Sequence, residues 1–177
     1  PMAFRADGDR IIATGVIDDT TLERFEEVTL DNPEIKTLVL QSIDGSVDDE
    51  TNVLLGQKVR DAGFTTIVPS DGMVASGGTD LFLAGQTRVL EAGACVGIHS
   101  WSDGEVEGQD IPRNDPEHDI YLKYYEAIGI DESFYWFTVD AAPAEAMHWM
   151  SAREAKQYSI ATQEVSELSQ QQVCDNR

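Results

Sequence analysis

Ser76 and His99 have side chains that can take part in nucleophilic catalysis, and the sequence around each of them suits such a role. Ser76 lies in the segment Val74–Gly85, whose pattern predicts a strand that turns sharply into a helix, and Gly77 and Gly78 follow it. The first N–H groups of a helix have no partner within the helix, and the helix dipole gives them partial positive charge. A serine there can attack a carbonyl group while nearby N–H groups stabilise the oxyanion. Serine is also a preferred N-cap, so a purely structural role stays open.

His99 offers the group that a serine nucleophile needs. A hydroxyl reacts poorly near neutral pH unless an imidazole accepts its proton. His99 ends a predicted strand, and both Asp44-Gly45 and Ser76-Gly77 follow predicted strands. Ligands of parallel sheets bind outside the carboxyl ends of the strands, so we expect these residues to face one cleft. The alternative for His99 is a ring that is simply hydrogen-bonded at a strand end.

The elements that must position these residues alternate between strands and helices. Strands are predicted over residues 10–14, 36–42, 64–68, 87–90 and 95–99. Helices are predicted over residues 18–30, 47–61, 117–128, 131–139 and 151–158, with a further helix that begins near Ser76. Ser151 and Glu154 have the spacing of a capping box. This order predicts an α/β domain with a mostly parallel sheet flanked by helices.

Composition limits the size and the partners of the protein. The 177 residues fit one domain, which we place at residues 1–162, followed by a polar tail at 163–177 without a clear core role. Twelve Lys and Arg against 33 Asp and Glu give a formal charge of −21, which argues against nucleic-acid binding. No apolar run approaches the ~20 residues of a membrane-spanning helix.

The two cysteines and the first residue give indications of the cellular compartment in which the protein works. Cys95 and Cys174 are too few for a disulfide scaffold and lack zinc-site spacing, so they form either one bridge or two free thiols. Because the chain begins with Pro1 rather than Met, we expect a processed or trimmed product. These features and the acidic surface favour a periplasmic or otherwise exported protein, with a cytoplasmic one as the alternative.

Four segments, in their order, resemble the ClpP/crotonase superfamily and specifically its ClpP-like serine peptidase branch. Leu38–Val47 is similar to the strand and turn that normally end in Ser-Pro-Gly-Gly-x-Val. Val74–Gly85 resembles the nucleophile segment, and Ala94–Ser100 resembles the histidine segment. His148–Ala155 is similar to the closing Leu-(Ser/Thr)-x-x-Glu-Ala segment. The resemblance covers residues 11–160 and implies a spiral of ββα units.

The resemblance also implies roles for individual residues. By position, Ser76 is the nucleophile and His99 the general base, and the N–H groups of Gly45 and Gly77 form the oxyanion hole. Asp140 is the expected acid that orients His99. The chain is longer than the family before its closing segment, so Glu145 and Asp131 are kept as substitutes.

Acidic residues near these positions depart from the family pattern. Ile43-Asp44 stands where the family has Pro-Gly, and an inward-pointing Asp44 would weaken an oxyanion site. Asp80, one turn into the nucleophile helix, adds to this concern, although acids in a first turn suit the helix dipole. His118 and His148 have no matching role, and we interpret both as structural or surface residues outside any metal site.

These observations predict a serine hydrolase that cleaves peptide or protein substrates without a cofactor or metal. One alternative is a catalytically inactive ClpP-fold binding or assembly module. Another is a crotonase-like enzyme that stabilises an acyl-CoA enolate. The resemblance further implies a homo-oligomer, with the aromatic segment Phe134–Phe137 as a candidate contact surface.

Overall fold

Eight strands form one mixed sheet in the computed structural model, which describes residues 1–177. The strands are β1 (Ala3–Asp7), β2 (Arg10–Ile17), β3 (Thr37–Ser46), β4 (Thr65–Val68), β5 (Met73–Ala75), β6 (Thr87–Leu90), β7 (Cys95–Ile98) and β8 (His148–Trp149). The helices are α1 (Thr21–Asp31), α2 (Asp49–Asp61), α3 (Gly77–Phe82), α4 (Asp119–Ile128), α5 (Glu132–Asp140), α6 (Ala152–Gln157) and α7 (Gln171–Cys174). Two 3₁₀ turns, η1 (Gly108–Asp110) and η2 (Pro116–His118), precede α4.

The sheet divides into two branches at β3. Thr37–Val39, the first part of β3, pairs in parallel with β4, whereas Ser42 and Ile43 pair in parallel with β5. β4 then pairs with β6, and β5 leads to β7 and β8. Only β1–β2 and β7–β8 are antiparallel, so the predicted mostly parallel α/β sheet is confirmed. This arrangement brings the carboxyl ends of β3, β5 and β7 side by side.

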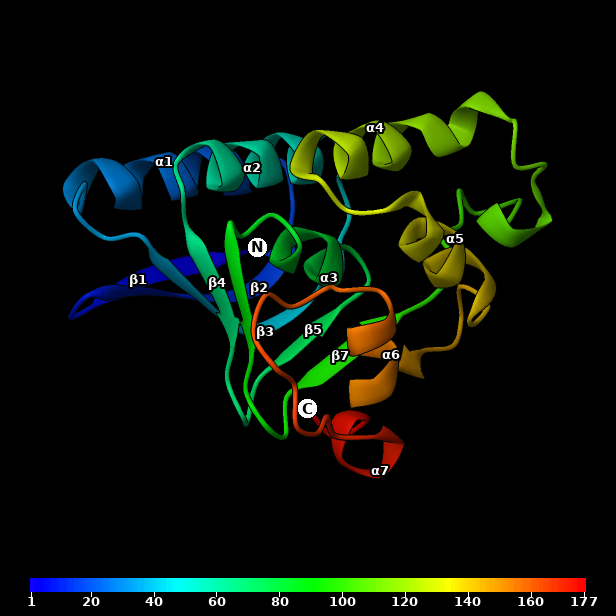
Figure 1. Cartoon of the computed structure of the whole chain (residues 1–177). Coiled ribbons are helices and arrows are strands. Elements are labelled where there is room, and N and C mark those ends of the chain that lie inside the picture. Colours follow the sequence, from blue (N-terminus) through cyan, green and yellow to red (C-terminus); the bar gives the residue numbers. More distant parts are fainter.

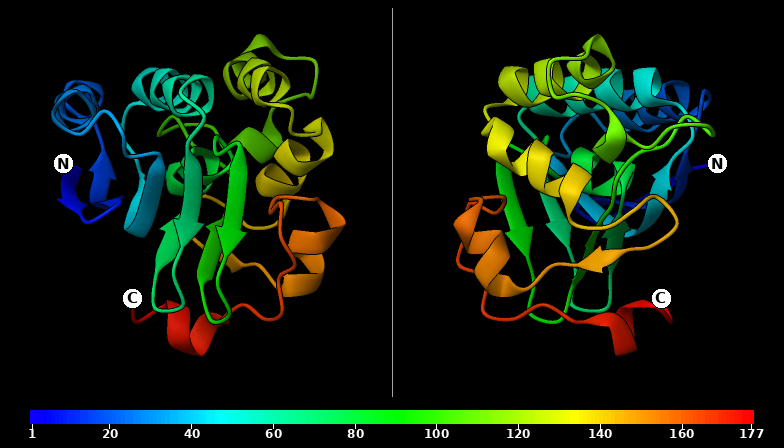
Figure 2. Two further views of the ribbon diagram at one scale, coloured as in Figure 1. Left: turned by 60° about the vertical axis from the view of Figure 1, so that its left-hand side comes forward. Right: turned by 90° about the vertical axis from the view of Figure 1, so that its right-hand side faces the viewer.

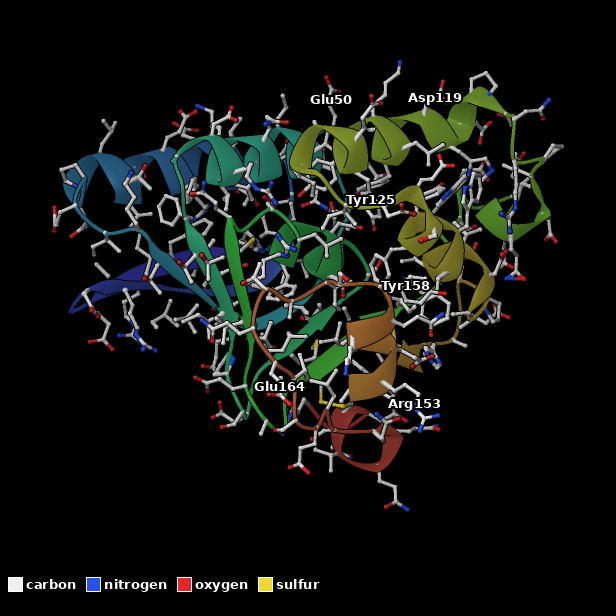
Figure 3. The ribbon with its side chains drawn as sticks, viewed as in Figure 1. Glu50, Asp119, Tyr125, Arg153, Tyr158 and Glu164 are labelled. Atoms are coloured by element: carbon white, nitrogen blue, oxygen red, sulfur yellow. A yellow bond between two sulfur atoms is a disulfide. The ribbon has the colours of Figure 1, made fainter.

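Helices cover the sheet and bury the centre of β3. α1, α2 and α4 form a layer over the strands, and α3 lies between that layer and the sheet (Figure 1); Figure 2 shows the three helices side by side. Glu50 and Asp119 lie on the outer side of this layer, whereas Tyr125 lies on its inner side (Figure 3). Residues 38–40 of β3 are buried because both faces of the strand are covered, which explains their continuous apolar run. None of the helices has the length and apolar character needed to cross a membrane.

Two short strands were not apparent from the sequence. β8 has two residues, which is too short for a periodic signal, whereas the strand expected before Ser76 is present as the three-residue β5. β1 is an antiparallel edge strand and is mostly exposed, so it lacks an apolar run. β3 also continues to Ser46, so most of the expected turn at 43–47 is strand. The capping box of Ser151 and Glu154 is confirmed at the start of α6.

The C-terminal segment packs against the domain. A disulfide joins Cys95 in β7 to Cys174 in α7 across 79 residues of sequence. Leu168 and Cys174 are buried, and the Arg177 guanidinium donates a hydrogen bond to the carbonyl of Gly72. Leu168 and Cys174 therefore belong to the core, which the polar composition of residues 163–177 did not indicate, whereas most of the segment is exposed.

Candidate active site

Ser76 is the single residue between β5 and α3, and its backbone is unusual. Its φ of 53° and ψ of −124° lie in a region that non-glycine residues rarely adopt. The N–H of Ser76 donates to the carbonyl of Gly97, and the Thr79 hydroxyl donates to the same oxygen at 2.7 Å. These bonds to β7 hold the strained turn, which presents the Ser76 side chain beyond the carboxyl end of β5.

Gly77 and Gly78 allow α3 to pack directly on β3. A Cβ atom on Gly77 would lie 2.5 Å from Cβ of Ser46, and one on Gly78 would lie 2.5 Å from the carbonyl oxygen of Ile43. Any larger residue would push the helix away from the strand. This close packing sets the position of the Ser76 turn.

His99 directly contacts Ser76. It follows β7, which pairs in parallel with β5, so the two residues leave neighbouring strands at the same edge. The Ser76 hydroxyl lies 2.8 Å from Nε2 of His99, and Nδ1 lies 3.0 Å from the carbonyl oxygen of Ala146. A carbonyl only accepts hydrogen bonds, so Nδ1 carries the ring proton and Nε2 accepts from the hydroxyl. This tautomer is the one that a general base requires.

Asp140 does not orient His99 in this structure. It ends α5, and its carboxylate accepts a hydrogen bond from Arg113 at 2.9 Å on the surface. The substitutes do not bond to His99 either: Asp131 caps α5 through the N–H of Ser133, and the side chain of Glu145 is exposed. The longer connection between α5 and β8 brings a backbone carbonyl to the place where a carboxylate was expected.

The two glycines expected to form an oxyanion hole lie beside the nucleophile. A Cβ atom on Gly45 would lie 3.5 Å from Cβ and 3.9 Å from Oγ of Ser76, so the β3 backbone passes close to the hydroxyl. Gly45 has a φ of 154°, which favours glycine. Gly77 begins α3, where the N–H groups have no partner within the helix. Asp44 is exposed, so its side chain does not point inward.

A buried polar group behind α3 was missed in the sequence. Asn52 of α2 is 1% exposed, and its side-chain amide donates to the carbonyl of Gly77 at 3.0 Å and to the hydroxyl of Tyr121 at 3.2 Å. The hydroxyl of Tyr121 in turn donates to Asp49. Asn52 falls on the same helical stripe as the buried Leu55, so a polar residue on an apolar face was the available signal.

Asp80 faces α4 from the first turn of α3. Its carboxylate accepts a hydrogen bond from the Tyr125 hydroxyl at 2.5 Å, and the Tyr124 hydroxyl donates to its backbone carbonyl. Burial raises the pKa of Asp80 to about 7, against the hydrogen bond from Tyr125, which lowers it. Asp80 is therefore a carboxyl group that ionises near neutral pH.

The other histidines do not contact the site. His118 is fully buried, and its Nδ1 lies 2.7 Å from the hydroxyl of Tyr135. His148 pairs with Glu154. No group of three or more His, Cys, Asp or Glu side chains has an arrangement that could hold a metal ion. A pocket beside His99 is lined by Ala144, Glu145, Ala146, Met147, Gln171 and Asp175.

Comparisons with known proteins show similarity of structure rather than of sequence. No protein-family model and no curated protein matches the chain. A mutant of the membrane-bound stomatin-specific protease 1510-N superimposes with a TM-score of 0.58 at 12% identity, covering 90% of this chain and 78% of that one. A ClpP1 mutant from Listeria monocytogenes gives a TM-score of 0.54 at 22% identity, with 92% of each chain covered.

Crotonase-type enzymes are similar to the same extent. An enoyl-CoA hydratase from Thermoplasma volcanium gives a TM-score of 0.54 at 12% identity, covering 97% of this chain and 72% of that one. At these identities the likeness concerns the fold. The branched, mostly parallel sheet with its helix layer is thus the fold that ClpP-like proteases share with the crotonase superfamily, and this chain has it.

Proposed function

We propose that the chain is a serine hydrolase, a ClpP-like peptidase that cleaves peptide bonds through an acyl-enzyme on Ser76. The observation that carries this proposal is the 2.8 Å contact between Oγ of Ser76 and Nε2 of His99. Oγ attacks the peptide carbonyl carbon while Nε2 takes the hydroxyl proton. The N–H groups of Gly45 and Gly77 then stabilise the oxyanion, and each such donor contributes on the order of 10²–10³ in rate.

The remaining steps use the same two residues. When the C–N bond breaks, His99 gives its proton to the leaving amine, and the acyl group stays on Ser76. Nε2 next takes a proton from water, the hydroxide attacks the ester, and the carboxylic acid leaves as Oγ regains the proton. No cofactor or metal enters this sequence.

Peptide substrates are supported by one structural neighbour. A second mutant of the stomatin-specific protease, with a TM-score of 0.58 at 13% identity, was solved in complex with a substrate peptide, covering 90% of this chain and 74% of that one. A crotonase-like reaction would leave the Ser76–His99 contact without a role.

Two further features bear on the compartment and the oligomeric state. The disulfide supports export to an oxidising compartment. The partly exposed side chains of Trp136 and Phe137 support self-association, which sedimentation velocity would measure.

The test is covalent labelling with a fluorophosphonate probe, followed by mass spectrometry to locate the modified residue. We expect modification at Ser76, lost in Ser76→Ala and in His99→Ala. Ser166→Ala, at an exposed serine, is the matched control and should label like the wild type. A folded protein that never reacts would reject the hydrolase and leave the inactive binding module as the better account.

A further inference from the structure

The partner of His99 is a backbone carbonyl in an exposed part of the chain. Ala146 is exposed, and it lies in the connection between α5 and β8. A carbonyl is a neutral dipole, whereas a carboxylate is charged. The hydrogen bond from Nδ1–H to a carbonyl therefore depends more strongly on distance and direction than a bond to a carboxylate would. The imidazole stays oriented only if this connection stays in place.

Glu107 fixes the connection on its N-terminal side. Its Oε1 accepts a hydrogen bond from the N–H of Ala144 at 2.7 Å, which links the polar loop after β7 to the carbonyl-bearing segment. The N–H of Ser100, next to His99, donates to the carbonyl of Ala142 at 2.8 Å. The N–H of Ala146 itself donates to Pro143, which closes a turn. Glu107 is therefore a side chain from another part of the chain that holds this turn in place.

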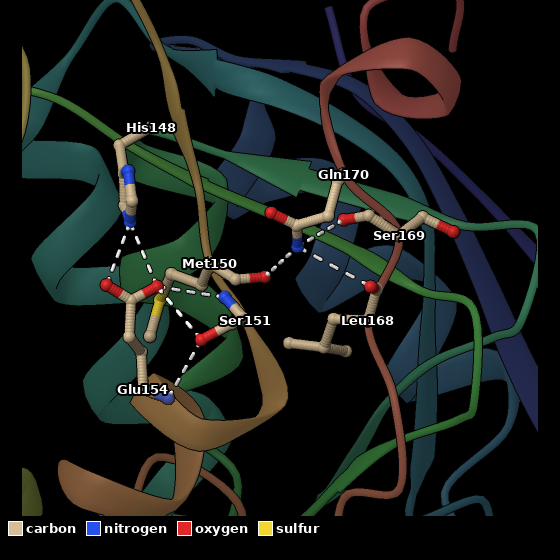
Figure 4. A network of polar contacts seen from close by, with 7 residues as sticks. All are labelled: His148, Met150, Ser151, Glu154, Leu168, Ser169 and Gln170. Atoms are coloured by element: carbon tan, nitrogen blue, oxygen red, sulfur yellow. Dashed lines mark hydrogen bonds and ion pairs between the residues drawn. The ribbon is translucent and has the colours of Figure 1, made fainter.

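His148 and Glu154 fix the connection on its C-terminal side. Nε2 of His148 lies 3.0 Å from both carboxylate oxygens of Glu154 (Figure 4). His148 also pairs across the sheet with Ile98, the residue before His99. Although burial favours the neutral acid, hydrogen bonds from Ser151 and His148 lower the pKa of Glu154. Glu154 is thus ionised near neutral pH and ties β8 to α6.

We propose that Glu107 and the His148–Glu154 pair are positioning residues that hold the Ala146 carbonyl against Nδ1 of His99. They take over, at a distance, the orienting task that a carboxylate performs in a Ser-His-Asp arrangement. The proposal rests on the proposed function in that it gives His99 the role of general base.

The experiment compares disruptive and conservative variants of both anchors. Glu107→Ala and His148→Leu remove a hydrogen-bonding group, whereas Glu107→Gln keeps an acceptor and His148→Gln keeps a donor. Two quantities are measured on the intact protein: the ring ¹⁵N chemical shifts of His99, which report the protonated nitrogen, and the rate of fluorophosphonate labelling. Near-UV circular dichroism checks the fold of each variant. Lys58→Met, which breaks a remote exposed ion pair with Glu26, is the matched control.

We expect Glu107→Ala and His148→Leu to give a mixture of His99 tautomers and to label more slowly by roughly 10-fold to 100-fold, because small displacements of a catalytic group have effects of this order. Both glutamine variants and Lys58→Met should resemble the wild type. Folded disruptive variants with unchanged ¹⁵N shifts would overturn the proposal, and so would glutamine variants as impaired as the disruptive ones. A wild type that never labels would reject the peptidase alone, since the ¹⁵N shifts still decide the positioning role.

Discussion

His99 and His148 lie close together in the fold and are held in opposite ways. His99 bonds to the Ser76 hydroxyl and to the Ala146 carbonyl, with no carboxylate. His148 bonds to both oxygens of Glu154, with no nucleophile. The chain therefore contains a nucleophile–histidine pair and a histidine–carboxylate pair as two separate units.

The difference shows what each kind of partner does to an imidazole. A carboxylate accepts a charge-assisted hydrogen bond, and in the His148–Glu154 pair it ties β8 to α6. A carbonyl accepts the hydrogen bond from the Nδ1 proton and leaves Nε2 as the acceptor for the Ser76 hydroxyl. The cost is that a carbonyl stabilises the imidazolium formed during the reaction less than a carboxylate would. Ser76 and His99 are thus placed for proton transfer, and Glu154 is used for structure.

The largest expected effect comes from replacing His99 by glutamine, and the same replacement at His148 is the comparison. His99→Gln can still hydrogen-bond to Ser76 but cannot take its proton, so we expect the labelling rate to fall by at least about 10³-fold. His148→Gln keeps a donor for Glu154 and should label at nearly the wild-type rate. The measurement is the second-order rate constant of fluorophosphonate labelling at neutral pH. Equal losses in the two variants would contradict the division of roles between these histidines.

Disulfide removal should have the next largest effect, because it frees a segment that contacts β8. The indole N–H of Trp149 donates to Asp175, directly after Cys174. Replacing both Cys95 and Cys174 by Ala should lower the free energy of unfolding by about 2–5 kcal/mol. Breaking the partly exposed His148–Glu154 pair should cost about 1 kcal/mol or less. Urea unfolding of both variants measures the two losses, and a smaller loss for the cysteine variant would show that the C-terminal segment contributes little.

The residue types and their order predicted one half of this comparison. Gly45 lies near the carboxyl end of β3, Ser76 and His99 follow β5 and β7, and the parallel pairing of these strands brings the three together. A serine, a histidine and a glycine are residue types with recognisable roles in catalysis. The predicted ends of the strands indicated where in the fold these three residues lie. The mostly parallel α/β arrangement was predictable for the same reason, whereas the branch of the sheet at β3 was not.

The other half could not be predicted from residue types. Every residue has a carbonyl, so nothing in the sequence marks Ala146, and the search for an acid led to Asp140 at a helix end. The packing of the C-terminal segment depends on a few residues, mainly Leu168 and Cys174, within a polar stretch. Asn52 was detectable on the apolar face of α2, but its partner Gly77 is remote in sequence.

The smallest expected effect concerns Asp80, whose pKa departs in the opposite direction from that of Glu154. Glu154 has His148 beside it, whereas Asp80 is desolvated between α3 and α4 and accepts a hydrogen bond only from a tyrosine. Its ordinary pKa is 3.8, and in the folded protein it is about 7. Between these values the folded chain binds more protons than the unfolded chain, so the contribution of Asp80 to the free energy of unfolding falls as pH rises.

Asp80→Asn removes this contribution while keeping an acceptor for the Tyr125 hydroxyl. The variant should match the wild type at about pH 4, where the acid is neutral, and should be more stable above pH 7 by up to a few kcal/mol. The measurement is the difference in unfolding free energy between the two proteins from pH 4 to pH 8, which cancels the other carboxyl groups. A difference that does not change with pH would mean that Asp80 ionises alike in the folded and unfolded chains, and the contrast with Glu154 would then disappear.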